Sequence, residues 1–273
     1  MALTDDFGGW GRVKTWRMKM AQSELSGRVA VVTGAARGLG RAYAQGLAKA
    51  GASVVVLDVS DCGDTVRDIE ANGGQAFGRQ CDVGDMASCR AAAEDTLARF
   101  GRLDVLVNNA ALFATLKSGR FDTIAEEDWE ACLRVNVTGV WNCCRAFVPP
   151  MRERGGSVIN ISSLAATYGL PNALHYTTSK AAVIGLTRGL ARELGRFNIR
   201  VNAVAPATVE TEGMSQFFSE KKEDAVKAIV SGQSIRRVLT TDDLVGTILY
   251  LASDASSMVT GQTIAVDGGT VLL

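Results

Sequence analysis

Arg28-Val-Ala-Val-Val-Thr-Gly-Ala-Ala-Arg-Gly-Leu-Gly40 is the stretch around which this 273-residue chain is organised. Residues 29–33 form a short β-branched apolar run, which predicts a strand buried on both faces. Gly34, Gly38 and Gly40 follow this strand and lead into a helix predicted to reach about residue 50. Glycines here permit a tight turn, let a phosphate approach bare backbone at a helix start, and let the helix press on the sheet. The stretch therefore predicts a dinucleotide site.

A second apolar strand, predicted over residues 53–57, ends in Asp58. A carboxylate there can accept both hydroxyls of an adenosine ribose and would repel a 2′-phosphate. The glycine spacing G-x3-G-x-G differs from G-x-G-x-x-G and would be a weak signal alone, so a structural βαβ unit with incidental glycines is the alternative. With Asp61 and Asp64 nearby, the pattern predicts NAD as the cofactor. Arg37 could reach a 2′-phosphate, which keeps NADP as the alternative.

The composition narrows the class of partner. The chain has 29 basic residues, 29 acidic residues and one histidine, so its net charge is near zero. This balance favours small-molecule partners over nucleic acid or an anionic membrane, and no apolar run has transmembrane length. Six cysteines lack zinc-site spacing and follow no signal peptide, which predicts reduced thiols in a cytoplasmic protein without a metal site. Cys143 and Cys144 are expected to be small core residues, with a redox pair as the alternative.

The rest of the chain repeats the alternation of strand and helix. Further strands are predicted near residues 75–81, 103–107, 157–161, 199–204 and 262–266, and helices near 85–100, 126–148 and 173–194. Repeated βα units form parallel sheets with helices on both faces. The fold class is therefore α/β: one Rossmann-like, doubly wound domain over residues 25–273 with a seven-stranded parallel sheet. Residues 1–24 precede this pattern and are expected to be a mobile arm or a non-native start.

Tyr176 and Lys180 are four residues apart in the predicted helix 173–194, so they share one face about a turn apart. A phenol titrates near pH 10 in water, and a fixed cation beside it would favour the phenolate and so suit acid–base chemistry at neutral pH. The pattern Tyr-x3-Lys alone is common. Ser163 strengthens it, because this residue follows the predicted strand 157–161 and a loop from there can return to the helix start.

Several motifs occur in order at compatible spacing: Thr33-Gly-x3-Gly-x-Gly40, Asn108-Asn-Ala110, Asn136, Ser163, Tyr176 and Lys180. In this combination the chain resembles the short-chain dehydrogenase/reductase family over about residues 27–269. The resemblance implies the sheet order 3-2-1-4-5-6-7, usually in a tetramer. It also implies hydride transfer between a nicotinamide cofactor and an alcohol or ketone.

The resemblance implies roles for individual residues. Tyr176 would be the general acid/base, Lys180 would lower its pKa and hold the nicotinamide ribose, and Ser163 would orient the substrate oxygen. Asn136 would support a proton-relay water. Cofactor contacts are implied for Gly34, Arg37, Gly38, Leu39, Gly40, Asp58, Asp82, Val83, Asn109, Ala110, Tyr176, Lys180, Pro206, Val209 and Thr211.

Two positions depart from the family pattern, because Ala111 and Ala207 stand where glycine is usual. If either backbone requires a positive φ, the extra methyl costs on the order of 1 kcal/mol. His175, beside Tyr176, is expected to be a helix-start residue near the pocket rim rather than a second base, because neighbouring helix residues point about 100° apart.

The leading functional hypothesis is an NAD-dependent secondary alcohol dehydrogenase or ketone reductase. A 3-oxoacyl thioester reductase, acting on acyl-carrier-protein or CoA esters, is the runner-up. Asp58 weighs against it, since many such reductases use NADPH. A non-catalytic dinucleotide sensor is the alternative from another class, although Ser163, Tyr176 and Lys180 are all present.

The residues expected to face the substrate are mostly apolar, with ordinary core as their alternative role: Leu112, Phe113, Leu164, Thr167, Tyr168, Leu170, Met214, Phe217 and Phe218. Together with a lid expected at about 207–235, they favour a medium-sized alicyclic or aromatic substrate.

Ala181, Gly185 and Gly189 form a stripe without bulk on the helix that carries Tyr176. Two glycines inside a helix each cost about 1 kcal/mol relative to alanine, so close packing of another backbone is expected there. The partner is either a second subunit or the chain's own sheet. With the apolar C-terminus 271–273 and the family's habit, the stripe predicts a homotetramer.

Overall fold

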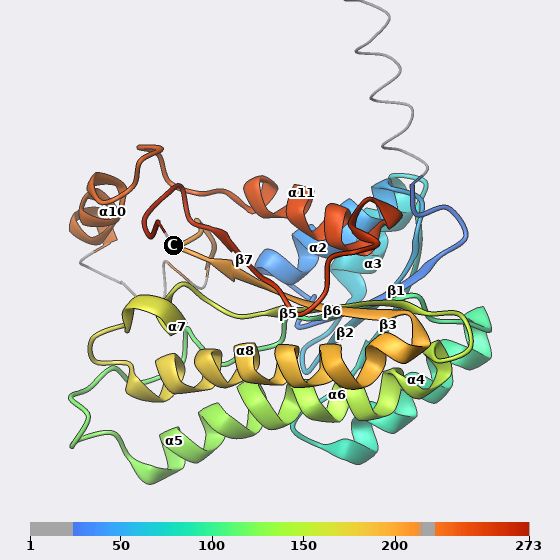
Figure 1. Ribbon diagram of the computed structural model, residues 1–273, viewed down its shortest axis with the longest axis horizontal. Coiled ribbons are helices and arrows are strands. Elements are labelled where there is room, and N and C mark those ends of the chain that lie inside the picture. The colour runs from blue at the N-terminus through green and yellow to red at the C-terminus, as the bar shows by residue number, and fades with distance from the viewer. Residues whose placement is uncertain (1–23, 213, 215–221, 273) are drawn as a thin grey trace, which may run out of the picture.

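The computed structural model describes residues 24–212, 214 and 222–272. Seven parallel strands form one sheet in the order β3-β2-β1-β4-β5-β6-β7 (Figure 1). The strands are β1 (Val29–Thr33), β2 (Ser53–Asp58), β3 (Gln75–Gln80), β4 (Val105–Asn108), β5 (Gly156–Ile161), β6 (Ile199–Pro206) and β7 (Thr263–Val266). The predicted fold class and strand order are confirmed.

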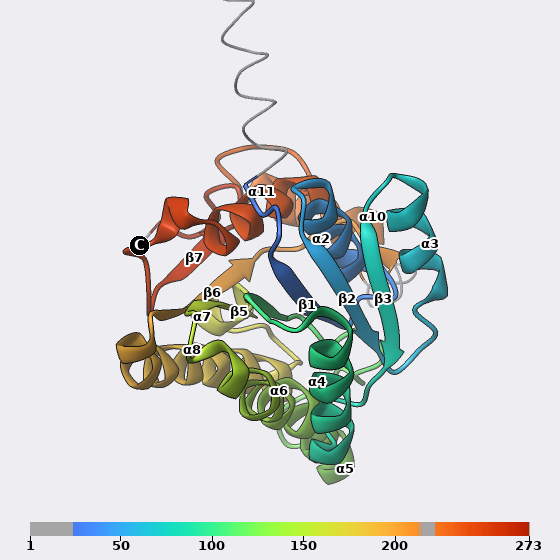
Figure 2. The same ribbon diagram turned by 90° about the vertical axis from the view of Figure 1, so that its right-hand side faces the viewer.

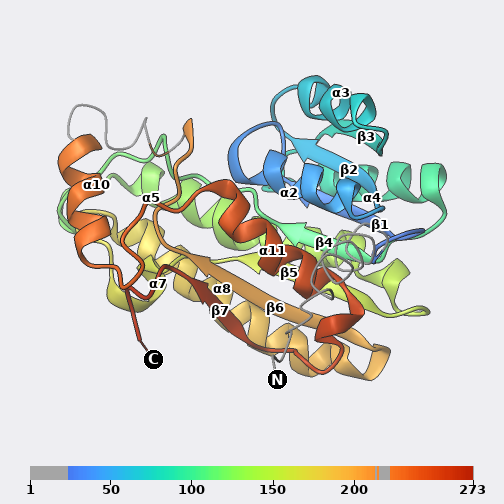
Figure 3. The ribbon, with the colours of Figure 1, turned by 90° about the horizontal axis from the view of Figure 1, so that it is seen from above.

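Helices cover both faces of the sheet (Figure 2). One layer contains α2 (Gly38–Lys49), α3 (Gly63–Ala71) and α11 (Thr241–Ala252), and the other contains α4 (Met86–Phe100), α6 (Gly139–Phe147) and α8 (Leu174–Leu194). The remaining α-helices are α5 (Glu126–Leu133), α7 (Ala165–Tyr168) and α10 (Lys222–Ser231). Figure 3 views the layer of α2, α3 and α11 from above.

Strand β1 lies at the centre of two apolar cores. All five of its residues are buried, because the sheet has helices on each side. Side chains alternate between faces, so Ala30 and Val32 pack in the core beneath α2 and α11, while Val29 and Val31 pack in the core beneath α4 and α6. This double burial explains why the strand is a continuous β-branched run rather than an alternating one.

The strand order reverses between β1 and β4, which are neighbours in the sheet although β2 and β3 separate them in sequence. At such a switch point the connections leave on opposite faces, and a crevice opens at the carboxyl ends of the strands. The loops after β1 and β4 therefore lie side by side at the edge where the predicted site residues cluster.

The predicted helix 126–148 is not one regular helix. A π-helical turn at Arg134–Thr138 joins α5 to α6. Asn136 lies within this turn, and its side-chain amide both accepts from the Leu112 N–H at 2.7 Å and donates to the Leu112 carbonyl at 3.1 Å. No glycine or proline marks this irregularity, so the sequence pattern did not reveal it.

The small-residue stripe of α8 does not pack on the chain's own sheet. A Cβ built on Gly185 or Gly189 meets no described atom within 4 Å apart from the backbone of α8 itself, and both glycines are exposed, as is Ala181. The alternative of packing against the chain's own sheet is therefore wrong.

Two predicted segments lie partly outside the described residues. Of the expected arm 1–24 only Glu24 is described, and within the expected lid 207–235 the exceptions are residues 213 and 215–221. Throughout the described ranges, the helices lack the combination of length and apolarity needed to cross a bilayer.

Candidate active site

The glycine turn between β1 and α2 has the close contacts that glycine alone permits. Gly34 has φ +62°, and a Cβ built on it would lie 2.7 Å from the Ala110 Cα. A Cβ on Gly40 would lie 2.1 Å from the Gly34 carbonyl oxygen. Gly38 has φ +56° and open space around its Cα, at the start of α2. Gly34 and Gly40 thus bring the loops and α2 together, and Gly38 leaves room for a phosphate.

A cleft of about 510 Å³ opens above this turn, at the carboxyl ends of β1 to β4. Most of the residues expected to bind the cofactor line it: Gly34, Arg37, Gly38, Leu39, Gly40, Asp58, Asp82, Val83, Asn109, Ala110 and Thr211. The sequence prediction missed other lining residues, among them Val59, Ser60, Cys81, Arg134, Val135 and Glu212. Arg134 pairs with Asp82 at 3.1 Å, a contact between distant segments that no local pattern signals.

Asp58 ends β2 with both carboxylate oxygens bonded to backbone. Oδ2 accepts from the Ala36 N–H at 3.0 Å and Oδ1 accepts from the Ser60 N–H at 2.9 Å. Each oxygen retains a further lone pair for a ribose hydroxyl. Arg37 is exposed on the rim of the same cleft, so the groups favouring NAD and NADP lie together.

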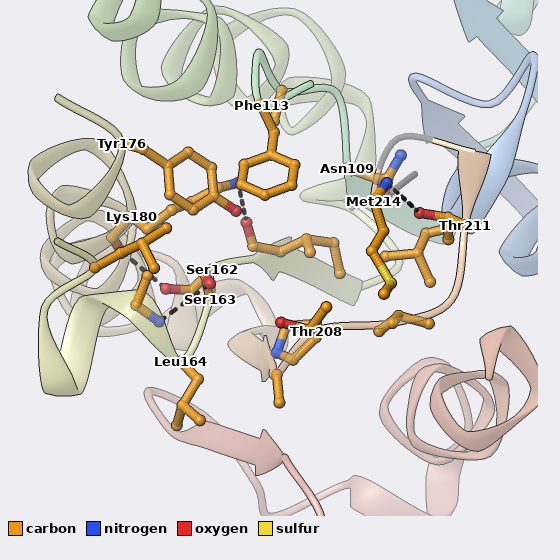
Figure 4. A pocket seen from close by; sticks show the side chains of 18 of the residues that line it. Asn109, Phe113, Ser162, Ser163, Leu164, Tyr176, Lys180, Thr208, Thr211 and Met214 are labelled. Atoms are coloured by element: carbon orange, nitrogen blue, oxygen red, sulfur yellow. Dashed lines mark hydrogen bonds between the residues drawn. The ribbon is translucent and has the colours of Figure 1, made fainter. Parts of the chain in front are cut away.

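A second cavity of about 180 Å³ adjoins the cleft (Figure 4). The two share Leu39, Asn109, Ala111, Phe113 and Thr211, so the dinucleotide cleft leads directly into it. Ser163, Tyr176, Lys180, Pro206 and Val209 line this cavity, as do Ile161, Ser162, Ala165, Ala207 and Thr208. The topology therefore brings the Ser-Tyr-Lys set and the glycine turn into one continuous site.

Tyr176 stands on the first turn of α8 with its ring against Phe113, at 4.9 Å between centroids and 47° between planes. Burial raises the pKa of the phenol to about 12, and hydrogen bonding with the Ser163 side chain opposes this rise. The phenol is therefore fully protonated at neutral pH and suited to donate a proton to a substrate oxygen.

Lys180 is buried one turn further along α8. Its Nζ donates to the Ile161 carbonyl at 2.8 Å and lies 5.7 Å from the Tyr176 ring centroid. Burial lowers the pKa of this ammonium to about 8. Lys180 is not among the groups that shift the pKa of Tyr176 here, so the lowering of that pKa by Lys180 that the family resemblance implies stays a prediction. Both groups are desolvated, and the ammonium is held by a backbone carbonyl rather than by the phenol oxygen.

Asn136 lines neither cavity. Its side chain is 1% exposed, and besides its two bonds to Leu112 it donates to the Ser179 hydroxyl at 3.1 Å. Ser179 in turn donates to the Tyr176 carbonyl at 2.8 Å. Asn136 therefore ties the loop after β4 to the start of α8, and so fixes Phe113 and Tyr176 relative to each other.

The two alanines that replace the usual glycines are not strained. Among the described residues, only Asn172 and Asn198 are non-glycine residues with positive φ. Ala111 and Ala207 therefore do not have the positive φ at which an extra methyl group would cost energy. Both instead line the substrate-side cavity.

His175 is not at the pocket rim. The side chain is completely buried, and neither ring nitrogen has a hydrogen-bond partner among the residues described. It shares the packed face of α8 with Ser179 and Val183, one and two turns further on, which is why it points away from the cavity. The prediction that it lies at a helix start is confirmed, since α8 begins at Leu174.

The cysteines found in the described residues are free and buried. Cys143 and Cys144 make separate contacts, with the Cys89 Sγ at 4.0 Å and the Asn108 amide at 3.6 Å respectively. Their prediction as core residues is confirmed. No group of three or more potential metal ligands occurs among the residues that the structure describes.

The residues expected to contact the substrate lie in different places. Phe113, Leu164, Tyr168, Leu170 and Met214 line the cavity. Leu112 lines the cofactor cleft instead. The prediction for Thr167 is wrong, because it is exposed and lines neither space. Phe217 and Phe218 lie outside the described residues.

Sheet order, glycine turn and Ser-Tyr-Lys set define a dinucleotide-dependent oxidoreductase, and comparison with known proteins agrees. The model of the family described as "Enoyl-(Acyl carrier protein) reductase" matches residues 34–271. The 3-oxoacyl-[acyl-carrier-protein] reductase FabG of Thermotoga maritima is 39% identical over 251 residues, covering 91% of this chain and 99% of the relative. The probable galactose dehydrogenase GalD of Rhizobium meliloti is 37% identical over 252 residues, covering 90% and 96%.

A solved structure is similarly close. The gluconate 5-dehydrogenase of Burkholderia cenocepacia, crystallised with NADP and tartrate, superposes with a TM-score of 0.85 at 34% identity, covering 92% of this chain and 98% of that chain. The chain belongs to the short-chain dehydrogenase/reductase family. It is therefore an oxidoreductase that uses a nicotinamide dinucleotide, and the cleft beside the glycine turn fits such a group.

Proposed function

We propose that this enzyme transfers hydride between NAD(H) and a medium-sized alicyclic or aromatic secondary alcohol or its ketone. The observation that carries the proposal is the apolar cavity that places Ser163 and Tyr176 directly beside the dinucleotide cleft. Its walls include Phe113, Leu164 and Met214, which suit an apolar ring.

In the reducing direction, Tyr176 donates its proton to the carbonyl oxygen, and Ser163 hydrogen-bonds that oxygen and orients it. The bound nicotinamide supplies the hydride. Lys180, held on the Ile161 carbonyl, would bond the nicotinamide ribose. In the oxidising direction Tyr176 acts as the phenolate and accepts the alcohol proton. Its pKa of about 12 disfavours the phenolate, so the Lys180 ammonium has to stabilise it once the cofactor is bound.

Charge in the cavity supports a neutral substrate. Among the described residues that line it, Lys180 is the only charged one, and its ammonium is bonded to Ile161. A small hydroxy acid would find no free cation for its carboxylate. The names of two relatives indicate sugar-type substrates, and the apolar side chains of this lining suit such substrates less well than an apolar ring.

The choice of NAD rests on Asp58, which lines the cleft and whose two carboxylate oxygens each keep a lone pair for a ribose hydroxyl. Arg37 and the NADP in the gluconate 5-dehydrogenase structure support the alternative. The second candidate reaction is reduction of a 3-oxoacyl thioester, which the family description and the Thermotoga relative favour.

We further propose a homotetramer working in the cytoplasm. The open faces of Gly185 and Gly189 and the 84% exposure of Leu272 support assembly, and the free buried cysteines support a reducing compartment. Light scattering at micromolar concentration tests the assembly, and a mass near 28.8 kDa would rule it out.

The test of the activity is a panel of ketones and one 3-oxoacyl-CoA ester, assayed with NADH and with NADPH at the nicotinamide absorbance. Alicyclic and aromatic ketones with NADH are expected to give the highest kcat/KM. A higher value for the thioester would favour the second candidate. Tight NADH binding without turnover of any compound would indicate a dinucleotide sensor instead.

A further inference from the structure

Tyr168 occupies a fixed place on the wall of the substrate-side cavity. It is the last residue of α7, the single helical turn that follows Ser163, and Gly169 ends this helix with φ 76°. The next segment is tied to α8, since the Leu170 N–H donates to the Thr177 hydroxyl at 3.0 Å. The backbone on both sides of Tyr168 is therefore held in place, and this fixes the point from which its side chain extends.

Tyr168 is 53% exposed at the mouth of the cavity, and its hydroxyl forms no hydrogen bond with another residue in the part of the chain that the structure describes, so in the empty cavity it faces water. Three other hydroxyls of the cavity are already engaged: Ser162 donates to the Lys180 carbonyl at 2.8 Å, Ser163 accepts from the Ala165 N–H at 3.1 Å and bonds with Tyr176, and Thr211 accepts from the Met214 N–H at 3.3 Å. Burial also raises the pKa of Tyr168, so it remains a neutral donor. It lies close enough to Tyr176 for its charge to raise the pKa of Tyr176 further.

The cavity thus has two kinds of hydroxyl. Ser163 and Tyr176 form a pair that meets the reacting oxygen, whereas Tyr168, like Thr208, has no partner for its hydroxyl among the described residues. A hydroxyl donor that faces a bound ligand without a partner loses its water and gains nothing, whereas a matched ligand oxygen restores the bond. A substrate with a single oxygen would displace water from the Tyr168 hydroxyl and leave that hydroxyl without a partner.

We propose that Tyr168 recognises a second oxygen on the substrate, so that the preferred compounds are cyclic hydroxyketones, diones or the corresponding diols rather than simple cyclic ketones. This inference rests on the proposed function for the reacting carbonyl. Tyr168 is a specificity-determining residue in this scheme, and it takes no part in the proton transfer.

The test measures binding without turnover, using the protein saturated with NADH, which cannot oxidise an alcohol. Calorimetry compares cyclohexanol with cyclohexane-1,3-diol and cyclohexane-1,4-diol. Wild type is expected to bind at least one diol more tightly than cyclohexanol. Tyr168→Phe is expected to weaken that diol about tenfold and to change cyclohexanol less than twofold. Thr208→Val is the matched control, because it removes another cavity hydroxyl and is expected to affect alcohol and diol alike.

Two results would overturn the inference: wild type binding cyclohexanol at least as tightly as every diol, or Tyr168→Phe weakening cyclohexanol and diol equally. A parallel assay of 4-hydroxycyclohexanone and cyclohexanone separates this from the proposed function. Turnover of both ketones with equal efficiency in wild type and Tyr168→Phe refutes the role of Tyr168 alone. Diol binding that depends on Tyr168, without turnover of any ketone, refutes the proposed reaction and leaves the role of Tyr168 supported.

Discussion

Replacing Asp58 by asparagine should change the cofactor preference from NADH towards NADPH. The side chain keeps its shape and loses its charge at the point where β2 meets the cleft. Hydrogen bonds from a ribose diol to a carboxylate are charge-assisted, and losing that charge costs about 1.5–3 kcal/mol, or about 10-fold to 100-fold in kcat/KM for NADH. One asparagine oxygen cannot accept from both the Ala36 and the Ser60 N–H as the two carboxylate oxygens do, so stability should be measured alongside.

The same substitution should help NADPH. A carboxylate about 5 Å from a doubly charged phosphate is repelled by about 1.7 kcal/mol at a water-like dielectric, which corresponds to roughly 15-fold. The ratio of kcat/KM values for NADH and NADPH should therefore fall by at least about 150-fold. Initial rates with each cofactor, at a fixed ketone concentration and low salt, measure this ratio.

Asp61→Asn is the matched control, because it removes the same charge three residues away from a side chain that is exposed and does not line the cleft. It should change the ratio by less than about threefold, since solvent screens that charge. The reasoning is refuted if wild type prefers NADPH, or if Asp61→Asn shifts the ratio as much as Asp58→Asn.

Three further predictions concern the backbone, the charge and the buried histidine of the site. Gly40→Ala forces a Cβ to within 2.1 Å of the Gly34 oxygen, so it should lower the free energy of unfolding by about 3 kcal/mol or more and abolish NADH binding. Gly246→Ala, in open space on α11, should instead raise the free energy of unfolding by up to about 1 kcal/mol. Equal melting temperatures for the two variants would contradict this. Because the Lys180 pKa of about 8 lies below its unfolded value, the folded state loses the proton first, so the free energy of unfolding of wild type relative to Lys180→Met should rise between about pH 8 and 10.5; a flat difference would argue against charge burial. His175→Ala should lower stability by about 2–4 kcal/mol by opening a cavity, yet leave the pH profile of kcat unchanged, and a displaced profile would indicate that His175 takes part in proton transfer.

The sequence predicted the fold because the central strands β1, β2, β4 and β5 are mostly apolar, buried runs that end in or are followed by a polar residue or glycine. The side chains of such runs can be buried on both faces only in a sheet that helices cover on each side. The alternation of strand and helix then leaves few possible topologies. The glycine turn was predictable because only glycine fits where the chain passes so close to itself. The contacts of Gly34 and Gly40 leave no room for a side chain.

Contacts between distant segments were not predictable in this way. The π-turn at Arg134–Thr138 depends on Asn136 meeting Leu112, and the partner of Lys180 is a carbonyl on β5. The complete burial of His175 follows from which face of α8 packs inward, which its position next to Tyr176 does not reveal. These features depend on side-chain geometry across the fold, whereas residue order encodes mainly local structure.

The most direct measurement of the central claim is the turnover of an alicyclic ketone with NADH by Tyr176→Phe, together with the affinity of that variant for NADH. The phenylalanine ring retains the contact with Phe113, and only the proton donor is lost. Turnover should fall by about 10²-fold to 10⁴-fold, while the Kd for NADH stays within about threefold of wild type. Near-normal turnover in Tyr176→Phe would contradict the account.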